Sequence, residues 1–129
     1  MARQEVTGKR DLTYSRWHRT LSDSCTYIDV DGVEYCNNCR APLALIETAK
    51  DYGQYKATTI LRKLALKANL PAYLVLLIVK NGDIVGFRRR QVAPSYSVTY
   101  DETPEEYGHF LEMLHQRCPC QQPAKARSI

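Results

Sequence analysis

The sequence predicts an α/β fold, in which a mixed β-sheet is flanked by helices. Segments with the two-residue period of a strand alternate along the chain with segments that have the 3.6-residue period of an amphipathic helix. One of these helices lies between two apolar strands, which predicts a parallel crossover unit, and an Asn-Gly turn predicts an antiparallel hairpin beside it. The length of 129 residues suits one hydrophobic core. We predict a single domain over 1–129, with a core of about 10–118 and flexible tails at 1–9 and 121–129.

Composition places the chain among folded domains without a membrane span. Charged residues make up 25% and hydrophobic residues 44%, with a net charge of +4. The longest apolar run, "AYLVLLIV", is far shorter than the roughly 20 residues that cross a bilayer, and no apolar signal segment follows the first methionine. We therefore expect a cytoplasmic protein with no membrane partner.

The first half of the chain predicts a helix and two paired strands. The helix covers Asp11–Leu21, and its stripe recurs at helical spacing: Tyr14, Trp17, His18 and Leu21. A strand over Cys25–Cys36 follows, in which Asp29 and Asp31 alternate onto one face. "PLALIET", which begins at Pro42, predicts a second strand buried on both faces and joined to the first through the turn "NNCRA".

The second half predicts a helix, a hairpin and a final helix. Apolar residues in "TTILRKLALKANL" recur at helical spacing, with Thr58 or Thr59 as the start signal and Pro71 just past the end. "AYLVLLIV" predicts a central strand, and "KNGD" predicts a tight turn into the strand "IVGFRR". "TPEEYGHFLEML" carries a capping box, with Thr103 at the N-cap and Glu106 at N3.

Four of the five cysteines form two pairs with metal-ligand spacing. Cys36 and Cys39 make a CxxC pair, and Cys118 and Cys120 make a CxC pair. We predict that these four thiolates bind one structural zinc ion, because four thiolates leave no coordination position open for water. His109 or His115 could substitute for a thiolate, and free thiols, a disulfide or an iron site are the alternatives.

Two acids are predicted to converge on neighbouring strands. Paired strands lie about 4.8 Å apart, and Asp31 and Glu47 stand at positions that bring their carboxylates together. An oxygen-rich site of this kind suits Mg²⁺ or Mn²⁺, which polarises a phosphodiester and lowers the pKa of a bound water. Lys50 offers a positive charge for the developing phosphate.

These residues resemble a known family. "RWHRTL", "YIDVDGVEY" and "PLALIE", followed by a helix and "PAYLVLLIV", resemble the restriction-endonuclease-like PD-(D/E)xK nuclease superfamily over roughly residues 12–80. The resemblance implies an αβββαβ core and Mg-dependent endonuclease activity, with Asp31 and Glu47 as metal ligands. The family lysine stands two places after the second acid, where this chain has Ala49. That role passes to Lys50 or to Lys56, with Gln54 as a further polar candidate.

Basic residues supply a predicted nucleic-acid surface. Strand alternation puts Arg88 and Arg90 of the triplet "RRR" on one face, and Arg19 adds a third cation from the first helix. The implied partner is nucleic acid, with DNA preferred over RNA and a homodimer left open. The function predicted from sequence is a metal-dependent nuclease. The alternative is a catalytically inactive, zinc-stabilised module that binds nucleic acid or another protein.

Overall fold

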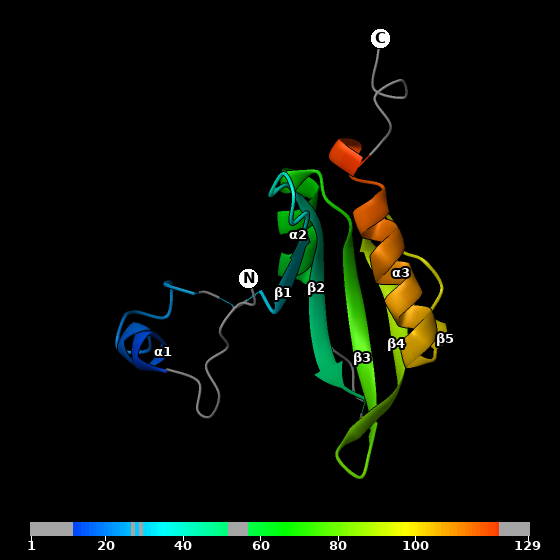
Figure 1. Cartoon of the computed structure of the whole chain (residues 1–129). Coiled ribbons are helices and arrows are strands. Elements are labelled where there is room, and N and C mark those ends of the chain that lie inside the picture. The colour runs from blue at the N-terminus through cyan, green and yellow to red at the C-terminus, as the bar shows by residue number, and fades with distance from the viewer. Residues whose placement is uncertain (1–11, 27, 29, 52–56, 122–129) are drawn as a thin grey trace.

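A five-stranded mixed sheet forms the centre of the fold (Figure 1). The computed structural model describes residues 12–26, 28, 30–51 and 57–121. The strands lie in chain order, β1-β2-β3-β4-β5, with β2 and β3 parallel and the other neighbours antiparallel. The strands are β1 (Gly32–Tyr35), β2 (Pro42–Lys50), β3 (Ala72–Lys80), β4 (Asp83–Ala93) and β5 (Tyr100–Glu102). The helices are α1 (Thr13–His18), α2 (Thr59–Ala68), α3 (Pro104–Gln116) and the 3₁₀ turn η1 (Pro119–Gln121).

Helices α2 and α3 cover opposite faces of this sheet (Figure 1). Alternation along β2 sends Ala44 and Ile46 into the core under α3, and sends Leu45 into the core under α2. Burial on both faces explains why β2 and β3 are apolar almost throughout. The predicted α/β class with a mixed, helix-flanked sheet is confirmed.

Three predicted local signals are found where the sequence placed them: the end of α2, the turn between β3 and β4, and the start of α3. Helix α2 stops at Asn69, whose φ of 57° is left-handed, and the β3–β4 turn uses the positive φ of Asn81 and Gly82. At the start of α3, Glu106 N donates to Thr103 Oγ1 at 3.1 Å, and Thr103 N donates to Glu106 Oε1 at 2.8 Å. The predicted capping box is therefore present, and it sets the direction in which α3 crosses the sheet.

Strand β1 is shorter than the predicted Cys25–Cys36. Its register with β2 pairs Gly32 with Ile46, and continuing it would bring position 30 opposite Thr48. Thr48 N instead donates to Asp31 Oδ2 at 2.9 Å, so the carboxylate replaces the backbone partner and the ladder ends. As a result, two strands, rather than the three of an αβββαβ core, precede α2 within the described residues.

Other elements differ from prediction in extent. Helix α1 covers only Thr13–His18, buries no residue and stands clear of both sheet faces (Figure 1). Strand β4 continues to Ala93, so the arginine triplet lies within the strand rather than at its end. Strand β5 was not predicted, because three residues are too few to show a period.

Some predictions fall outside the described residues. These are Asp29, Lys56 and the tails at 1–9 and 121–129, apart from Gln121, which ends η1. Within the described ranges, no helix is long and apolar enough to cross a membrane.

Candidate functional site

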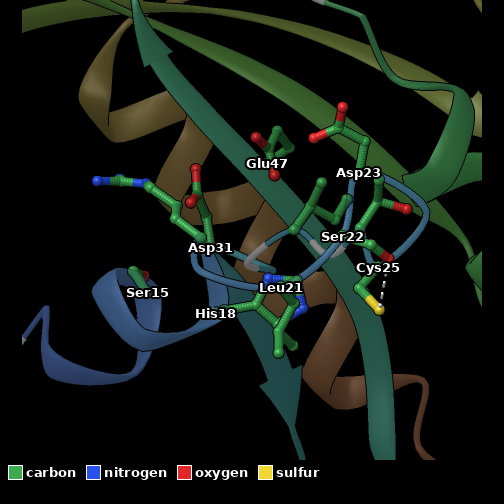
Figure 2. Close-up of a pocket in the computed structure, with 11 residues that line it drawn as sticks. Ser15, His18, Leu21, Ser22, Asp23, Cys25, Asp31 and Glu47 are labelled. Atoms are coloured by element: carbon green, nitrogen blue, oxygen red, sulfur yellow. Dashed lines mark hydrogen bonds between the residues drawn. The ribbon is translucent and has the colours of Figure 1, made fainter.

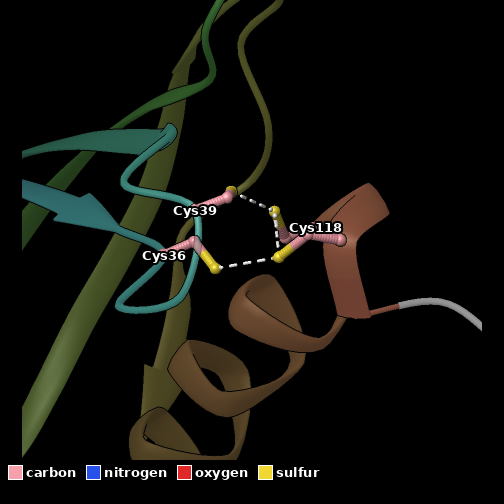
Figure 3. A group of neighbouring side chains, drawn as sticks. Cys36, Cys39 and Cys118 are labelled. Atoms are coloured by element: carbon pink, nitrogen blue, oxygen red, sulfur yellow. Dashed lines mark hydrogen bonds between the residues drawn. The ribbon is translucent and has the colours of Figure 1, made fainter.

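A tight turn between β1 and β2 presents the first pair of cysteines. Cys36 N donates to Ala41 O and Arg40 N donates to Cys36 O, both at 2.8 Å. Arg40 takes a left-handed φ of 68°, which reverses the chain within this turn. Cys36 and Cys39 therefore project toward the same point, above the end of α3 (Figure 3).

The end of α3 presents the second pair. Cys118 N donates to His115 O, and Gln121 N donates to Cys118 O, so the chain turns through η1 directly after the helix. The sulfurs face those of the turn: Cys36 Sγ lies 3.3 Å from Cys120 Sγ, and Cys39 Sγ lies 3.5 Å from Cys118 Sγ. All four sulfurs lie within 4.8 Å of one another.

This spacing suits one metal ion. A tetrahedral zinc ion with bonds of about 2.3 Å holds its sulfurs about 3.8 Å apart. The observed separations of 3.3 to 3.6 Å are close to that value and exceed the S–S bond of a disulfide, and all five cysteines are free thiols. The four predicted ligands Cys36, Cys39, Cys118 and Cys120 are thus brought together and could bind a metal such as zinc.

The surroundings of the thiols favour ionisation at one end of the cluster. Hydrogen bonds from the Cys39 backbone and the Gln121 side chain lower the pKa of Cys36 to about 6. At Cys118 a backbone hydrogen bond at Cys120 lowers the pKa, but burial and the neighbouring thiols outweigh it and raise the pKa to about 12. Because a metal binds thiolates, loading the cluster releases protons from the remaining thiols.

The histidines named as substitute ligands have other partners. His115 Nε2 lies 2.7 Å from Glu34 Oε1, which joins α3 to β1 beside the cysteine cluster. His109 is exposed and lies 3.8 Å from Glu112 Oε1. Neither belongs to the cluster of four sulfurs, so the candidate metal cluster contains only cysteines.

The predicted acids line a cleft at the other end of β1 from the cysteine cluster. This cleft, of about 640 Å³, lies between the α1 segment and the sheet edge, and its lining includes His18, Arg19, Asp23, Asp31 and Glu47. In Figure 2 the side chains of Asp31 and Glu47 enter it from the residue before β1 and from β2. Both predicted acids therefore face one solvent-filled space.

Hydrogen bonds hold Asp31 in a defined orientation. Its Oδ2 accepts from Thr48 N at 2.9 Å and from Thr48 Oγ1 at 3.2 Å. Its Oδ1 has no hydrogen-bond partner among the described residues. Thr48 therefore fixes the Asp31 carboxylate through one of its two oxygens.

The predicted lysine does not join the acids. Pairing of β2 with β3 runs without a shift from Leu45–Ala72 to Lys50–Leu77. Alternation therefore places Lys50 on the face opposite Glu47, while Ala49 shares the face of Glu47. Arg19 is the predicted residue that brings positive charge to the cleft.

The arginine triplet divides into three environments. Arg88 and Arg90 lie on the α2 face, opposite Leu76 and Leu74 of β3, as strand alternation predicts. Arg88 Nε lies 3.2 Å from Asp101 Oδ1 and 3.5 Å from Asp51 Oδ2. Arg90 lies over the Tyr96 ring, with its Cζ 5.7 Å from the ring centroid.

Arg89 points to the other face and is a structural residue that the sequence analysis did not single out. Its guanidinium donates to both carboxylate oxygens of Glu102, at 2.8 and 2.9 Å. The same group lies over the Phe110 ring, with the Arg89 Cζ 3.8 Å from the ring centroid. Hydrogen bonding to Glu102 raises the pKa of Arg89 further. The "RRR" pattern carries no sign of this pairing, because β5 and α3 lie later in the chain.

Comparisons with protein-family models, curated proteins and solved structures found no match to this chain. What can be said of its chemistry therefore rests on the cysteine cluster, the acidic cleft and the arginine-bearing face.

Proposed function

We propose that this chain is a zinc-stabilised domain whose acidic cleft binds a divalent cation and hydrolyses phosphodiester bonds of nucleic acid. The observation that carries the proposal is that Asp31, the residue before β1, and Glu47 of the adjacent strand β2 line one cleft together with Arg19. This arrangement agrees with the roles that the PD-(D/E)xK resemblance implies for the two acids.

The donor chemistry of the cleft fits Mg²⁺. This ion prefers oxygen ligands and is held by one or two carboxylates while it keeps several waters. Asp31 and Glu47 supply such carboxylates, and no cluster of three or more metal-ligating side chains forms around them among the described residues. When bound, the ion would supply Lewis-acid polarisation of the phosphate and a more acidic water.

The chain's own residues orient the substrate in this proposal. Asp31 is held by Thr48, so its open oxygen keeps a fixed direction. Arg19 attracts the phosphate to the cleft and stabilises negative charge that develops on it. His18 also lines the cleft.

The proposed zinc ion serves the acids indirectly. Strand β1 has only four residues and, among the described residues, pairs with β2 alone, so it needs support at both ends. Cys36 and Cys39 follow its end and would be tied through zinc to the end of α3, while Asp31 caps its start. Zinc would thereby fix the edge strand that carries Asp31.

A cleavage panel tests this function. The zinc-loaded chain is incubated with Mg²⁺ or Mn²⁺ and with single-stranded and duplex DNA and RNA. Asp31→Asn and Glu47→Gln should each abolish metal-dependent cleavage without a change in the far-ultraviolet circular dichroism spectrum. Asp23→Asn is the matched control, because Asp23 lines the same cleft but is not a proposed ligand. Cleavage that survives both Asp31→Asn and Glu47→Gln would refute the assignment.

One observation favours a second function, a binding module without catalysis. Lys50 faces away from Glu47, so the family lysine has no equivalent among the described residues of the cleft. Zinc at one ion per chain, salt-sensitive nucleic-acid binding and no cleavage in any arm of the panel would establish this alternative.

A further inference from the structure

A rigid loop between β4 and β5 holds an exposed aromatic ring. Tyr96 is 59% exposed, although the loop around it is tied to β4. Ser97 N donates to Gln91 O at 3.1 Å, Gln91 N donates to Ser97 Oγ at 2.9 Å, and Gln91 Nε2 donates to Ser95 O at 2.9 Å. These hydrogen bonds hold the backbone on both sides of Tyr96, and its ring forms a platform. The loop therefore needs little further ordering when a ligand binds, and little binding free energy is lost to it.

Two guanidinium groups lie over this ring. The Cζ of Arg62 lies 4.9 Å and that of Arg90 lies 5.7 Å from the ring centroid. Arg62 is held in place because its Nη1 donates to Val92 O at 2.9 Å and to Pro94 O at 3.1 Å. Carbonyl oxygens are neutral, so the charge of Arg62 remains available to an anion.

Arg90 differs from its two neighbours in the same strand. Arg88 and Arg89 each have a carboxylate partner, whereas Arg90 makes no ion pair with any described residue. Two cations beside one ring repel each other unless an anion lies between or near them. A phosphate group has the charge and the acceptor geometry that two guanidinium forks bind.

We propose that Tyr96 stacks an unpaired base of a nucleic acid strand while Arg62 and Arg90 bind the phosphates beside that base. This inference rests on the proposed function and specifies its substrate as a single strand. A tyrosine face stacks any exposed base, whereas bases within a duplex are already stacked on each other.

The platform lies on the same face of the sheet as the acidic cleft. Glu47, Leu74 and Arg90 occupy one row across β2, β3 and β4. Two strand spacings separate the ends of that row, about 10 Å along the sheet. Leu74, in the middle of that row, is buried under α2, so a nucleic acid strand bound at Tyr96 and Arg90 would have to pass beside this helix to reach Glu47.

Binding without cleavage tests the platform. Fluorescence anisotropy of a labelled 20-nucleotide DNA strand is measured with zinc-loaded protein in EDTA concentrations that leave the tightly bound zinc in place. Tyr96→Leu should weaken binding by about 5- to 150-fold, the range that corresponds to one stacked base. Tyr96→Phe, which keeps the ring, should bind within twofold of the unmodified chain, and duplex DNA of the same sequence should bind more weakly. Tyr96 is exposed, so neither variant disturbs the core.

The arginines are tested through salt dependence. Arg90→Gln should reduce the slope of log K against log salt by about 0.7, the value for one phosphate contact on a single strand. Equal affinity of Tyr96→Leu and the unmodified chain, equal losses in Tyr96→Leu and Tyr96→Phe, or preference for duplex would overturn the inference.

The same variants separate this inference from the proposed function. Asp31→Asn should keep the Tyr96-dependent binding, because Asp31 is not part of the platform. Tyr96-dependent binding with no cleavage would support the platform and refute the nuclease. Cleavage that is insensitive to Tyr96→Leu would support the nuclease and refute the platform.

Discussion

Replacing Glu102 with glutamine should destabilise the fold strongly, although Glu102 lies outside both candidate sites. Its carboxylate accepts two hydrogen bonds from Arg89, and each side chain is only 13% exposed. The pair joins β4 to β5, and Arg89 also stacks on Phe110 of α3. Glu102→Gln keeps the shape but leaves the guanidinium of Arg89 without its counter-charge.

The size of the effect follows from this burial. Removing one partner of a buried ion pair costs about 3–5 kcal/mol, whereas an exposed pair is worth about 0–1 kcal/mol. The Arg89–Glu102 pair is mostly but not fully enclosed, so we expect a loss of about 2–4 kcal/mol in the free energy of unfolding. That is a large share of the about 5–15 kcal/mol that stabilises a typical domain.

Urea denaturation of the zinc-loaded protein measures this loss. At a slope of about 2 kcal/mol per molar urea, the transition midpoint of Glu102→Gln should fall by on the order of 1.5 M. Asp101→Asn is the matched control, because Asp101 pairs with the adjacent Arg88 at 3.2 Å but is 73% exposed. The double variant Arg89→Met/Glu102→Leu should recover much of the loss, since no unpaired charge remains. Equal midpoints for Glu102→Gln and Asp101→Asn would refute the reasoning.

Two predictions concern the cysteine cluster and a buried phenol. Cys120→Ser should lower zinc content from one ion per chain toward zero and reduce the melting temperature, while Cys25→Ser, which changes an exposed cysteine outside the cluster, should alter neither. Elemental analysis decides this, and undiminished zinc in Cys120→Ser would contradict the four-thiolate site. Burial raises the pKa of Tyr107 to about 12. Because this folded-state pKa exceeds the usual value of about 10, the stability from neutral Tyr107 is complete below pH 10 and is lost as the pH rises through 12. The titration of Tyr107 is measured as the difference in phenolate absorbance between the unmodified chain and Tyr107→Phe as the pH rises. A midpoint of this difference near pH 10 would contradict the prediction.

The spacing of the cysteines in the sequence predicts which residues form the cluster, but not how the two pairs meet. The CxxC and CxC pairs identify the four cysteines of the candidate metal cluster, because the geometry of each pair depends on only three or four residues. The structure adds how they meet: the β1–β2 turn and the end of α3 lie side by side, with sulfurs 3.3 Å apart between Cys36 and Cys120. The His115–Glu34 contact next to them could not be predicted, since it joins residues far apart in the chain.

The acidic cleft shows where such reasoning ends. Asp31 and Glu47 could be paired from the sequence, because the short turn between two predicted strands restricts which residues face each other. The facing of Lys50 could not be decided, because it depends on whether β2 bulges near its end. The unbroken register with β3 shows that it does not.

The sequence by itself determined the α/β class, the start of α3, the Asn81–Gly82 turn and the four cysteines of the candidate metal cluster. Each of these depends on side-chain periodicity or on hydrogen bonds that form within a few residues. Only the tertiary structure decided which arginines of the triplet are neutralised and which one lies beside Tyr96. Ion pairs and stacking contacts depend on strand register and on elements that lie later in the sequence. The three consecutive arginines, Arg88, Arg89 and Arg90, therefore lie in three different environments.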